Sequence, residues 1–241
     1  MIDTNNSFQK WNEVIAEAVS CNDSNDLLQL IVEAIYTVSD IDSISVMIYS
    51  KQAKPVCFFD NIKPASFRGS ITNYINGPYQ DNPFYRIAIT QPVCGLYSLR
   101  QIVTEEFWES DHYNKFYKDT NMRDELDFLY PIDGGGVLVL SMGRDFDHDM
   151  FGQSDIERLK VIEPVIKVLL YKYIKATIEP GKAFSETPIN YPSLQSAIDR
   201  EFANLLTTRE REVVFLVLNG CSVKESAKLL DISPGTIKAH K

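Results

Sequence analysis

The residues best suited to chemistry in this 241-residue chain stand together in the segment GRDFDHDMFG. Asp145, Asp147, His148 and Asp149 supply three carboxylates and an imidazole, which are competent metal ligands. Their spacing matches neither an EF-hand nor a zinc motif, and acidic residues between a strand and a helix commonly cap the helix and stay solvated. We therefore predict neither a metal site nor a resident cofactor.

Catalytic motifs are missing from the sequence as well. It contains no GxSxG, no HExxH and no phosphate-cradling glycine loop, and the glycines at 134–136 are typical of a hairpin turn. His112 beside Asp111 is interpreted as a surface histidine. Four cysteines without CxxC spacing argue against a disulfide framework or a zinc site. An enzyme is therefore the weakest hypothesis.

Charge and composition indicate a soluble protein with two unlike parts. The net charge is −9, yet the segment from Ala203 onward carries six basic and four acidic residues, so that the remaining 202 residues carry −11. An acidic front part repels phosphate, and only the C-terminal segment is suited to DNA. No apolar run reaches the roughly 18 residues of a membrane span, and no signal peptide is visible. We predict a cytoplasmic protein that does not enter a membrane.

Three helix start signals are packed into residues 206–241. Two are capping boxes, in which a hydroxyl and a carboxylate three residues apart satisfy early backbone N–H groups. The third is a serine followed by proline, whose missing N–H costs nothing at the first helical position. Two short helices, a turn and a new helix make a helix-turn-helix. The pairs are Thr207 with Glu210, Ser222 with Glu225, and Ser233 with Pro234.

These residues resemble the helix-turn-helix of LuxR/FixJ-type regulators, whose pattern runs LTxREREVL, GxSxKEIAxxL and ISPxTVKxH. Ser226 departs from the usual Ile and Val223 from a usual polar residue. The family's third helix continues past the position of His240 and a fourth follows, whereas this sequence ends at Lys241. The matching positions are Leu206, Thr207, Arg209, Glu210, Glu212, Val213, Gly220, Ser222, Lys224, Glu225, Ala227, Leu230, Ile232, Ser233, Pro234, Thr236, Ile237, Lys238 and His240.

The resemblance implies roles for individual residues. Lys238 and Ala239 are expected to face the DNA major groove, while Thr236 and nearby backbone N–H groups hold a phosphate. Lys224 and Lys241 are expected to add phosphate contacts. Ile237 and His240 are expected to pack inward.

The resemblance also implies a function. We expect a signal- or ligand-responsive transcription regulator that binds double-stranded DNA as a homodimer. The alternative is an antagonist that dimerises through its front domain but does not bind DNA, because the sequence ends before the last helices of the family. Whether the end at Lys241 is natural decides between them.

In front of this segment, apolar periodicity predicts an α+β fold, an N-terminal α-β-α sandwich with an antiparallel sheet, followed by the all-α segment. Residues 1–176 are expected to form a sensor domain, 177–192 a linker rich in proline, and 193–241 the DNA-binding domain. Asn25 is expected to cap the second helix, and Ser154 with Glu157 the last one of the sensor. The expected helices are 8–18, 27–38, 67–74, 83–89, 105–117, 156–173 and 193–202, and the expected strands 43–49, 54–59, 125–130 and 136–142.

This order of elements resembles GAF- or PAS-like sensors and the front half of some LuxR-type regulators. The local similarity lies in NPFYR, in EEFWESDHYNKFYKD and in FGQSDIERLKVIEPVIKVLL. Lactone receptors of this family use a Trp, a Tyr four residues later and an Asp-Pro. Here Tyr74 keeps the tyrosine, but Ser70 replaces the Trp and Asn82-Pro83 replaces Asp-Pro. The resemblance therefore argues against a typical acyl-homoserine lactone and leaves another small molecule open.

The middle of the sensor is rich in aromatic residues. Aromatic side chains bury large areas wherever helices meet a sheet, so they form either the core or the lining of a ligand pocket, and the core is favoured. The apolar stripe from Ile156 to Tyr173 has two interpretations of equal weight, a dimer surface or a cover for the sheet. The candidate ligand-binding residues are Tyr74, Tyr79, Phe84, Tyr97, Trp108 and Phe116.

Overall fold

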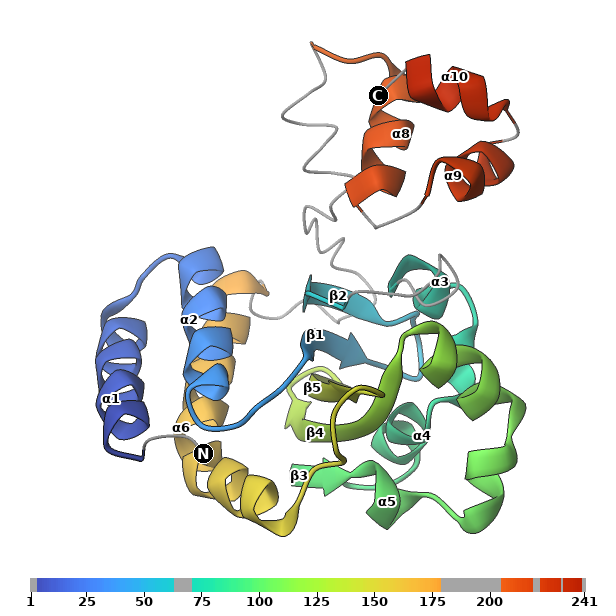
Figure 1. The fold of residues 1–241 in the computed structure, drawn as a ribbon. Coiled ribbons are helices and arrows are strands. Elements are labelled where there is room, and N and C mark those ends of the chain that lie inside the picture. The colour runs from blue at the N-terminus through green and yellow to red at the C-terminus, as the bar shows by residue number, and fades with distance from the viewer. Residues whose placement is uncertain (1–3, 63–70, 179–204, 219–221, 231, 240–241) are drawn as a thin grey trace.

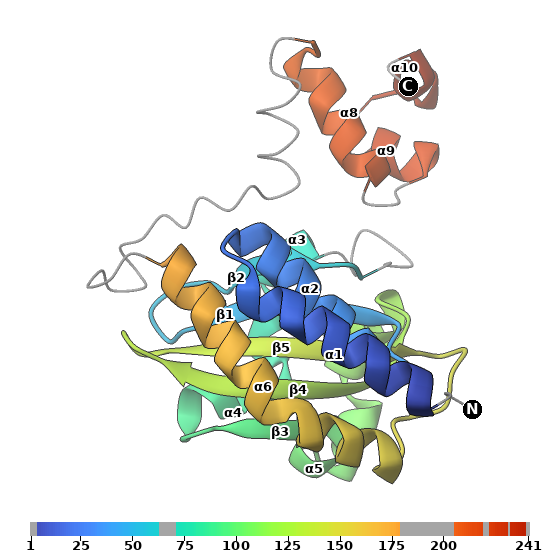
Figure 2. The same cartoon turned by 90° about the vertical axis from the view of Figure 1, so that its left-hand side faces the viewer.

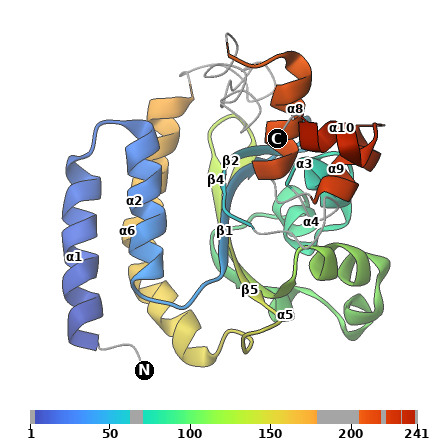
Figure 3. The same cartoon turned by 45° about the horizontal axis from the view of Figure 1, so that its top comes forward.

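The computed structural model describes residues 4–62, 71–178, 205–218, 222–230 and 232–239. Residues 4–178 form three layers, with a five-stranded antiparallel sheet between two layers of helices (Figure 3). The sheet order is β2-β1-β5-β4-β3. This is the predicted α-β-α sandwich. The strands are β1 (Ser43–Tyr49), β2 (Val56–Asp60), β3 (Gly95–Ser98), β4 (Met122–Ile132) and β5 (Gly136–Asp145).

Long helices cover one face of the sheet, and short helices cover the other (Figures 1 and 3). α2 and α6 lie next to the strands, and α1 packs against α2 on the side away from the sheet (Figures 2 and 3). The first layer contains α1 (Thr4–Ser20), α2 (Ser24–Tyr36) and α6 (Gln153–Thr177). The second contains α3 (Ile71–Ile75), α4 (Pro83–Thr90), α5 (Leu99–Ile102) and the single turns η2 (Pro78–Asp81), η3 (Glu105–Glu109) and η4 (Tyr113–Tyr117).

Strand alternation divides the interior into two cores. In β1, the residues Ile44, Val46 and Ile48 face the long helices, whereas Met47 and Tyr49 face the short ones. All seven residues of β1 are buried, because both faces of the sheet are covered. The two cores are therefore separated by the sheet alone.

The apolar stripe of α6 belongs to the first core. Leu159, Ile166 and Leu170 are fully buried against the sheet, which decides between the two interpretations of this stripe in favour of a cover for the sheet. A different face of α6 is exposed and apolar, and it consists of Val161, Val165 and Val168.

Two predicted helix caps are each wrong by two residues. The N-cap of α2 is Asp23, whose carboxylate accepts hydrogen bonds from the N–H groups of Asn25 and Asp26 at 2.8 and 3.1 Å. At the start of α6 the carboxylate of Asp155, rather than the Ser154 hydroxyl, accepts the N–H of Gly152 at 2.9 Å. Asp155 takes this role because it is buried in an ion pair with Arg144 at 3.2 Å, which a local pattern does not reveal.

The middle of the chain differs from the prediction in two places. Residues 95–98 form the short edge strand β3, although QPVCG was expected only to interrupt helices. The single helix expected over 105–117 is instead a 3₁₀ turn followed by a π-helical turn. Ser70 and residues 67–69 of the expected helix 67–74 lie outside the described residues, as do most of the predicted linker and all of the helix over 193–202.

Three helices make up the described part of the C-terminal segment. α8 (Thr208–Leu218), α9 (Val223–Leu229) and α10 (Pro234–Ala239) share a small core of Val213, Ala227 and Ile237. The predicted helix starts at Thr208 and Pro234 are confirmed. The predicted stop at Asn219-Gly220 lies outside the described residues.

Candidate functional site

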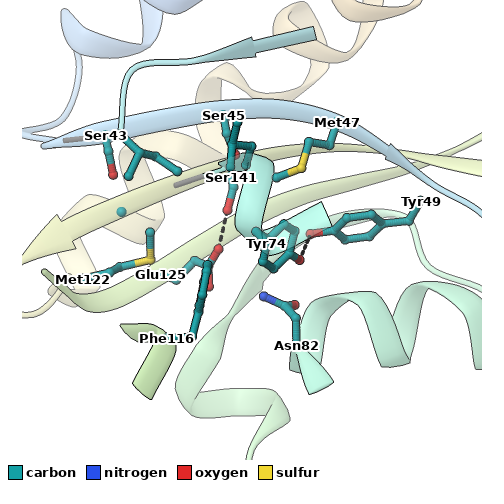
Figure 4. Close-up of a pocket in the computed structure, with 13 residues that line it drawn as sticks. Ser43, Ser45, Met47, Tyr49, Tyr74, Asn82, Phe116, Met122, Glu125 and Ser141 are labelled. Atoms are coloured by element: carbon teal, nitrogen blue, oxygen red, sulfur yellow. Dashed lines mark hydrogen bonds between the residues drawn. The ribbon is translucent and has the colours of Figure 1, made fainter. Parts of the chain in front are cut away.

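A small polar cavity lies between the sheet and the short helices of the second layer (Figure 4). Its volume is about 20 Å³, which is room for roughly one water molecule. Strands β1, β4 and β5 supply its floor, and α3 and η4 supply its roof. The lining residues are Ser43, Ser45, Met47, Tyr49, Ile62, Ile71, Tyr74, Asn82, Phe116, Met122, Glu125, Ser141 and Gly143.

Strand register brings the polar floor together. Ser45 of β1 stands opposite Ser141 of β5, and Ser141 stands opposite Asp127 of β4. Glu125 lies two residues before Asp127 and therefore on the same face of the sheet. Four polar residues from three strands thus form one patch on the cavity side.

A hydrogen-bond network joins the two acids of this patch. The hydroxyl of Ser141 lies 2.6 Å from Oδ1 of Asp127 and also within hydrogen-bonding distance of Oε1 of Glu125. Tyr117 donates its hydroxyl to Oε2 of Glu125 at 2.5 Å. Oδ2 of Asp127 is buried and has no partner among the described residues. The acceptors therefore outnumber the hydrogen atoms that the side chains supply when both acids are ionised.

Burial disfavours ionisation of this pair. Desolvation raises the pKa of Asp127 well above its ordinary value, and the nearby charge of Glu125 raises it further. Desolvation likewise raises the pKa of Glu125, against hydrogen bonds from Ser141 and Tyr117 that lower it. The two carboxylates therefore require a shared proton or an added donor near neutral pH.

Two tyrosine hydroxyls complete the polar side of the cavity. Tyr49 and Tyr74 hydrogen-bond to each other through their hydroxyls at 2.7 Å (Figure 4). Burial raises the pKa of both phenols, and the charges of Glu125 and Asp127 raise them further. Both hydroxyls stay protonated, so this pair can donate one hydrogen bond and accept others.

Phe116 separates the cavity from an outer cleft of about 500 Å³. Its ring stands against Tyr74 on one side, at 5.0 Å between centroids, and against His112 on the other, at 5.4 Å. Phe116 lies in the π-helical turn η4, a rare geometry that is frequent at functional sites. The outer cleft is lined by Asn73, Gly77, Pro78, Asp81, Asp111, His112, Lys115, Phe116 and Asp119.

His112 is not the simple surface residue that the sequence indicated. Its Nε2 is buried without a partner among the described residues, and desolvation lowers its pKa from 6.5 to about 4. The imidazole is therefore neutral at pH 7. The flanking rings of Phe107 in η3 and of Phe116 and Tyr117 in η4 cause this burial.

The structure brings two of the six candidate ligand-binding residues to the cavity, Tyr74 and Phe116. Tyr79 and Phe84 are buried in the second core behind the lining. Tyr97 stands opposite Asp127 in β3, with its hydroxyl accepting the N–H of Cys94 at 3.3 Å. Trp108 packs on Tyr113 at 5.1 Å.

The polar floor of the cavity was not predicted from the sequence. Its signal was the alternation of Ser43 and Ser45 in one strand and of Glu125 and Asp127 in another, with the polar residues on one face. The loop of Asp145 to Asp149 has a local structural role, since His148 Nδ1 lies 2.7 Å from Asp42. Within the described ranges no cluster of three or more His, Cys, Asp or Glu side chains could hold a metal ion.

Asn82, which stands where the lactone receptors of the resemblance have Asp, begins a helix. Its Oδ1 accepts the N–H of Tyr85 at 3.0 Å and thereby caps α4. The Asn82 side chain also lines the cavity (Figure 4).

The helix-turn-helix presents its predicted DNA-binding residues on the surface. Lys224 of α9 and Thr236 and Lys238 of α10 are exposed, whereas Ile237 is fully buried. The side chain of Ala239, and Lys241 and His240 entirely, lie outside the described parts of the chain.

Local hydrogen bonds explain why these helices begin where they do. The carboxylate of Glu210 accepts both the N–H and the hydroxyl of Thr207 at 2.7 Å, which is the predicted capping box. The hydroxyl of Ser233 accepts the N–H of Thr236 at 3.0 Å. Arg209 pairs with Glu212 at 2.6 Å and donates to the carbonyl of Leu230, so α8 is joined to the turn after α9.

The family profile of bacterial regulatory proteins, luxR family, matches residues 204–241. This match covers the three short helices and the exposed residues described above. Residues 204–241 therefore form a helix-turn-helix of the luxR family type.

Two further similarities each cover about two thirds of the chain. The first relative comes from Aeromonas salmonicida, and its name describes it as an HTH-type transcriptional regulator in the exeN 3′ region. It is 27% identical to this chain over 164 residues, which cover 66% of this chain and 83% of the relative. The VqsR LBD domain from Pseudomonas aeruginosa is 25% identical with a TM-score of 0.59, covering 68% of this chain and 96% of that domain.

A third solved structure shares the fold alone. The N-acylhomoserine lactone dependent factor CepR2 from Burkholderia cenocepacia is 13% identical with a TM-score of 0.52, covering 70% of this chain and 95% of that one. None of the described helices is both long enough and apolar enough to cross a membrane.

Proposed function

We propose that the protein is a cytoplasmic transcription regulator that binds double-stranded DNA through residues 193–241 and responds to a small molecule bound by residues 1–176, with residues 177–192 as linker. The observation that carries the proposal is the capped helix-turn-helix with Lys224, Thr236 and Lys238 exposed. The same segment matches the luxR family profile.

The DNA contacts divide into two kinds. Lys238, in the last turn of α10, donates to guanine O6 or N7 in the major groove, and Ala239 meets a thymine methyl group. Lys224, Lys241 and the hydroxyl of Thr236 contact phosphates, which position the protein without selecting sequence. The N–H of Thr236 is already capped by Ser233, so the phosphate contact rests on the hydroxyl.

A DNA-binding assay tests the proposal. Bound duplexes are first selected from a random library with the full chain, and filter binding then compares wild type, Lys238→Ala and Lys224→Ala at 50 and 200 mM salt. Lys238→Ala is expected to weaken the selected sequence about tenfold or more, because one specific base contact contributes ~1–3 kcal/mol. Lys224→Ala is expected to weaken all sequences alike and to reduce the salt slope by about one.

Lys51→Ala is the matched control, since Lys51 is an exposed lysine in the turn between β1 and β2. It removes the same charge far from the helix-turn-helix in sequence. Equal binding by wild type and Lys238→Ala would contradict the assignment.

The signal site is the polar cavity beneath Tyr74 and Phe116. A volume of about 20 Å³ is far below the roughly 300–1,000 Å³ of a site for a drug-sized ligand. Displacement of the Phe116 side chain joins the cavity to the outer cleft of about 500 Å³. The combined volume then lies within the range of a site for a drug-sized ligand. We assign entry of the ligand to this route, since Phe116 lies in an irregular helical turn.

A homodimer fits the need to place two recognition helices on half-sites about 34 Å apart. The sensor offers one candidate surface, the exposed valines of α6 at positions 161, 165 and 168. Their spacing of four and three residues places them on one face of the helix. The antagonist alternative has no supporting observation in the described residues.

A further inference from the structure

The ligand class can be derived from the floor of the cavity, on the basis of the proposed small-molecule site. Glu125 lines the cavity, and Asp127 lies just behind the lining, where the Ser141 hydroxyl joins it to Glu125. Asp127 is completely buried, and its Oδ2 has no partner among the described residues. An unsatisfied buried carboxylate oxygen is costly, so this atom requires a donor.

The cavity offers these acids no countercharge. No Lys, Arg or His belongs to its lining, and neither acid takes part in an ion pair within the described part of the chain. The surrounding groups are hydroxyls, which come from Ser141, Tyr117 and the Tyr49–Tyr74 pair. Such a site repels anions and attracts a cation or a dense set of donors.

The remaining lining is apolar. Met47, Ile71, Phe116 and Met122 surround the polar floor and match a hydrocarbon or aromatic body. We propose that the cavity binds an organic amine, whose ammonium group is held by Glu125 and Asp127 and whose apolar body lies against Phe116 and the two methionines. The ammonium group takes the place of the proton that the two acids otherwise share.

Three probe compounds of similar shape test which polar group the cavity prefers. They are 2-phenylethylamine, 2-phenylethanol and 3-phenylpropionate, which carry a cation, a neutral donor and an anion on closely similar bodies. Each probe is titrated into the full chain, and binding is measured by calorimetry and by the shift of the thermal unfolding midpoint. We expect the amine to bind at least tenfold more tightly than the alcohol, and the anion not to bind.

Variants of Glu125 and Asp127 test whether these two acids cause the preference for the amine over the alcohol. Glu125→Gln with Asp127→Asn is expected to bring the amine to within about twofold of the alcohol while binding of the alcohol persists, which also shows that the cavity is intact. Glu157→Gln removes one negative charge from the exposed surface of α6 and is expected to keep the preference. Far-UV circular dichroism confirms that each variant is folded.

Each contrary outcome has a defined meaning. Absence of saturable amine binding, equal binding of amine and alcohol, or a preference that survives in the double variant would overturn the amine assignment. DNA binding is measured on the same preparations. Lys238-dependent DNA binding without an amine preference rejects the ligand class alone, whereas a protein that prefers the amine but binds no DNA rejects the regulator proposal alone.

Discussion

The imidazole of His112 stacks on the ring of Phe116 with 5.4 Å between centroids and 19° between planes. Phe116 is the wall between the inner cavity and the outer cleft, so His112 supports the closed position of that wall from outside. Protonation of the His112 imidazole therefore acts on the residue that lies between the inner cavity and the outer cleft.

Acidification is expected to destabilise the sensor through His112. Its pKa is about 4 in the folded protein because of burial, against an ordinary 6.5. Between these values the unfolded chain binds a proton that the folded chain does not, so stability is lost as pH falls from 6.5 toward 4. The change His112→Phe keeps a stacked ring and removes the titration. The drop in urea midpoint between pH 7.5 and 5 is expected to be smaller in the variant.

His148 supplies a control of opposite sign. Its hydrogen bond to Asp42 raises its pKa, and such a group loses its contribution as pH rises. His148→Ala is therefore expected to enlarge the drop in urea midpoint between pH 7.5 and 5, or to leave it unchanged. An identical pH profile for His112→Phe and wild type would show that His112 is solvated and charged in the folded protein.

Replacement of Ser226 by alanine is expected to stabilise the helix-turn-helix. The hydroxyl of Ser226 is buried and has no hydrogen-bond partner among the described residues, at a position where the family pattern has Ile. Removing an unsatisfied buried hydroxyl contributes about 1 kcal/mol. The unfolding transition of α8 to α10, followed by hydrogen exchange of the full chain, is expected to show this gain.

Ser233→Ala is the matched change for comparison. Ser233 caps α10 by accepting the N–H of Thr236 at 3.0 Å, so its removal is expected to cost about 1 kcal/mol. Ser226→Ala is thus expected to raise the stability of the helix-turn-helix, and Ser233→Ala to lower it. If Ser226→Ala were as destabilising as Ser233→Ala, the hydroxyl of Ser226 would have to be satisfied in solution.

The outer face of α6 is expected to control assembly. Val161 is 79% and Val168 65% exposed, and both lie on the face opposite the buried stripe. The double change Val161→Asp with Val168→Asp is expected to weaken a homodimer at least about tenfold, because charges would be desolvated at the interface. Light scattering coupled to gel filtration over a range of concentrations measures the mass.

Lys160→Asp, at an exposed position of the same helix, is expected to leave the assembly unchanged. A dimer that resists the valine changes would require another surface. A monomer at all concentrations of wild type would require that DNA itself brings two copies together.

The sequence alone determined the helix-turn-helix, because its signals are local. A capping box and a Ser-Pro start each act over three residues, and Thr207, Ser233 and Pro234 accordingly begin their helices where the pattern predicts. Apart from the edge strand β3 and the turns over 105–117, the order of helices and strands in residues 4–178 was likewise visible, since periods of 3.6 and 2 are properties of neighbouring residues.

Only the tertiary structure decided what lies at the site. Ser45, Asp127 and Ser141 meet because antiparallel register places three distant strands side by side, and no local pattern specifies that register. Asp155 rather than Ser154 caps α6 because Arg144 reaches it from β5. The 3₁₀ turn η3 and the π-helical turn η4 bring the rings of Phe107 and Phe116 onto His112, and helical periodicity alone does not predict this geometry.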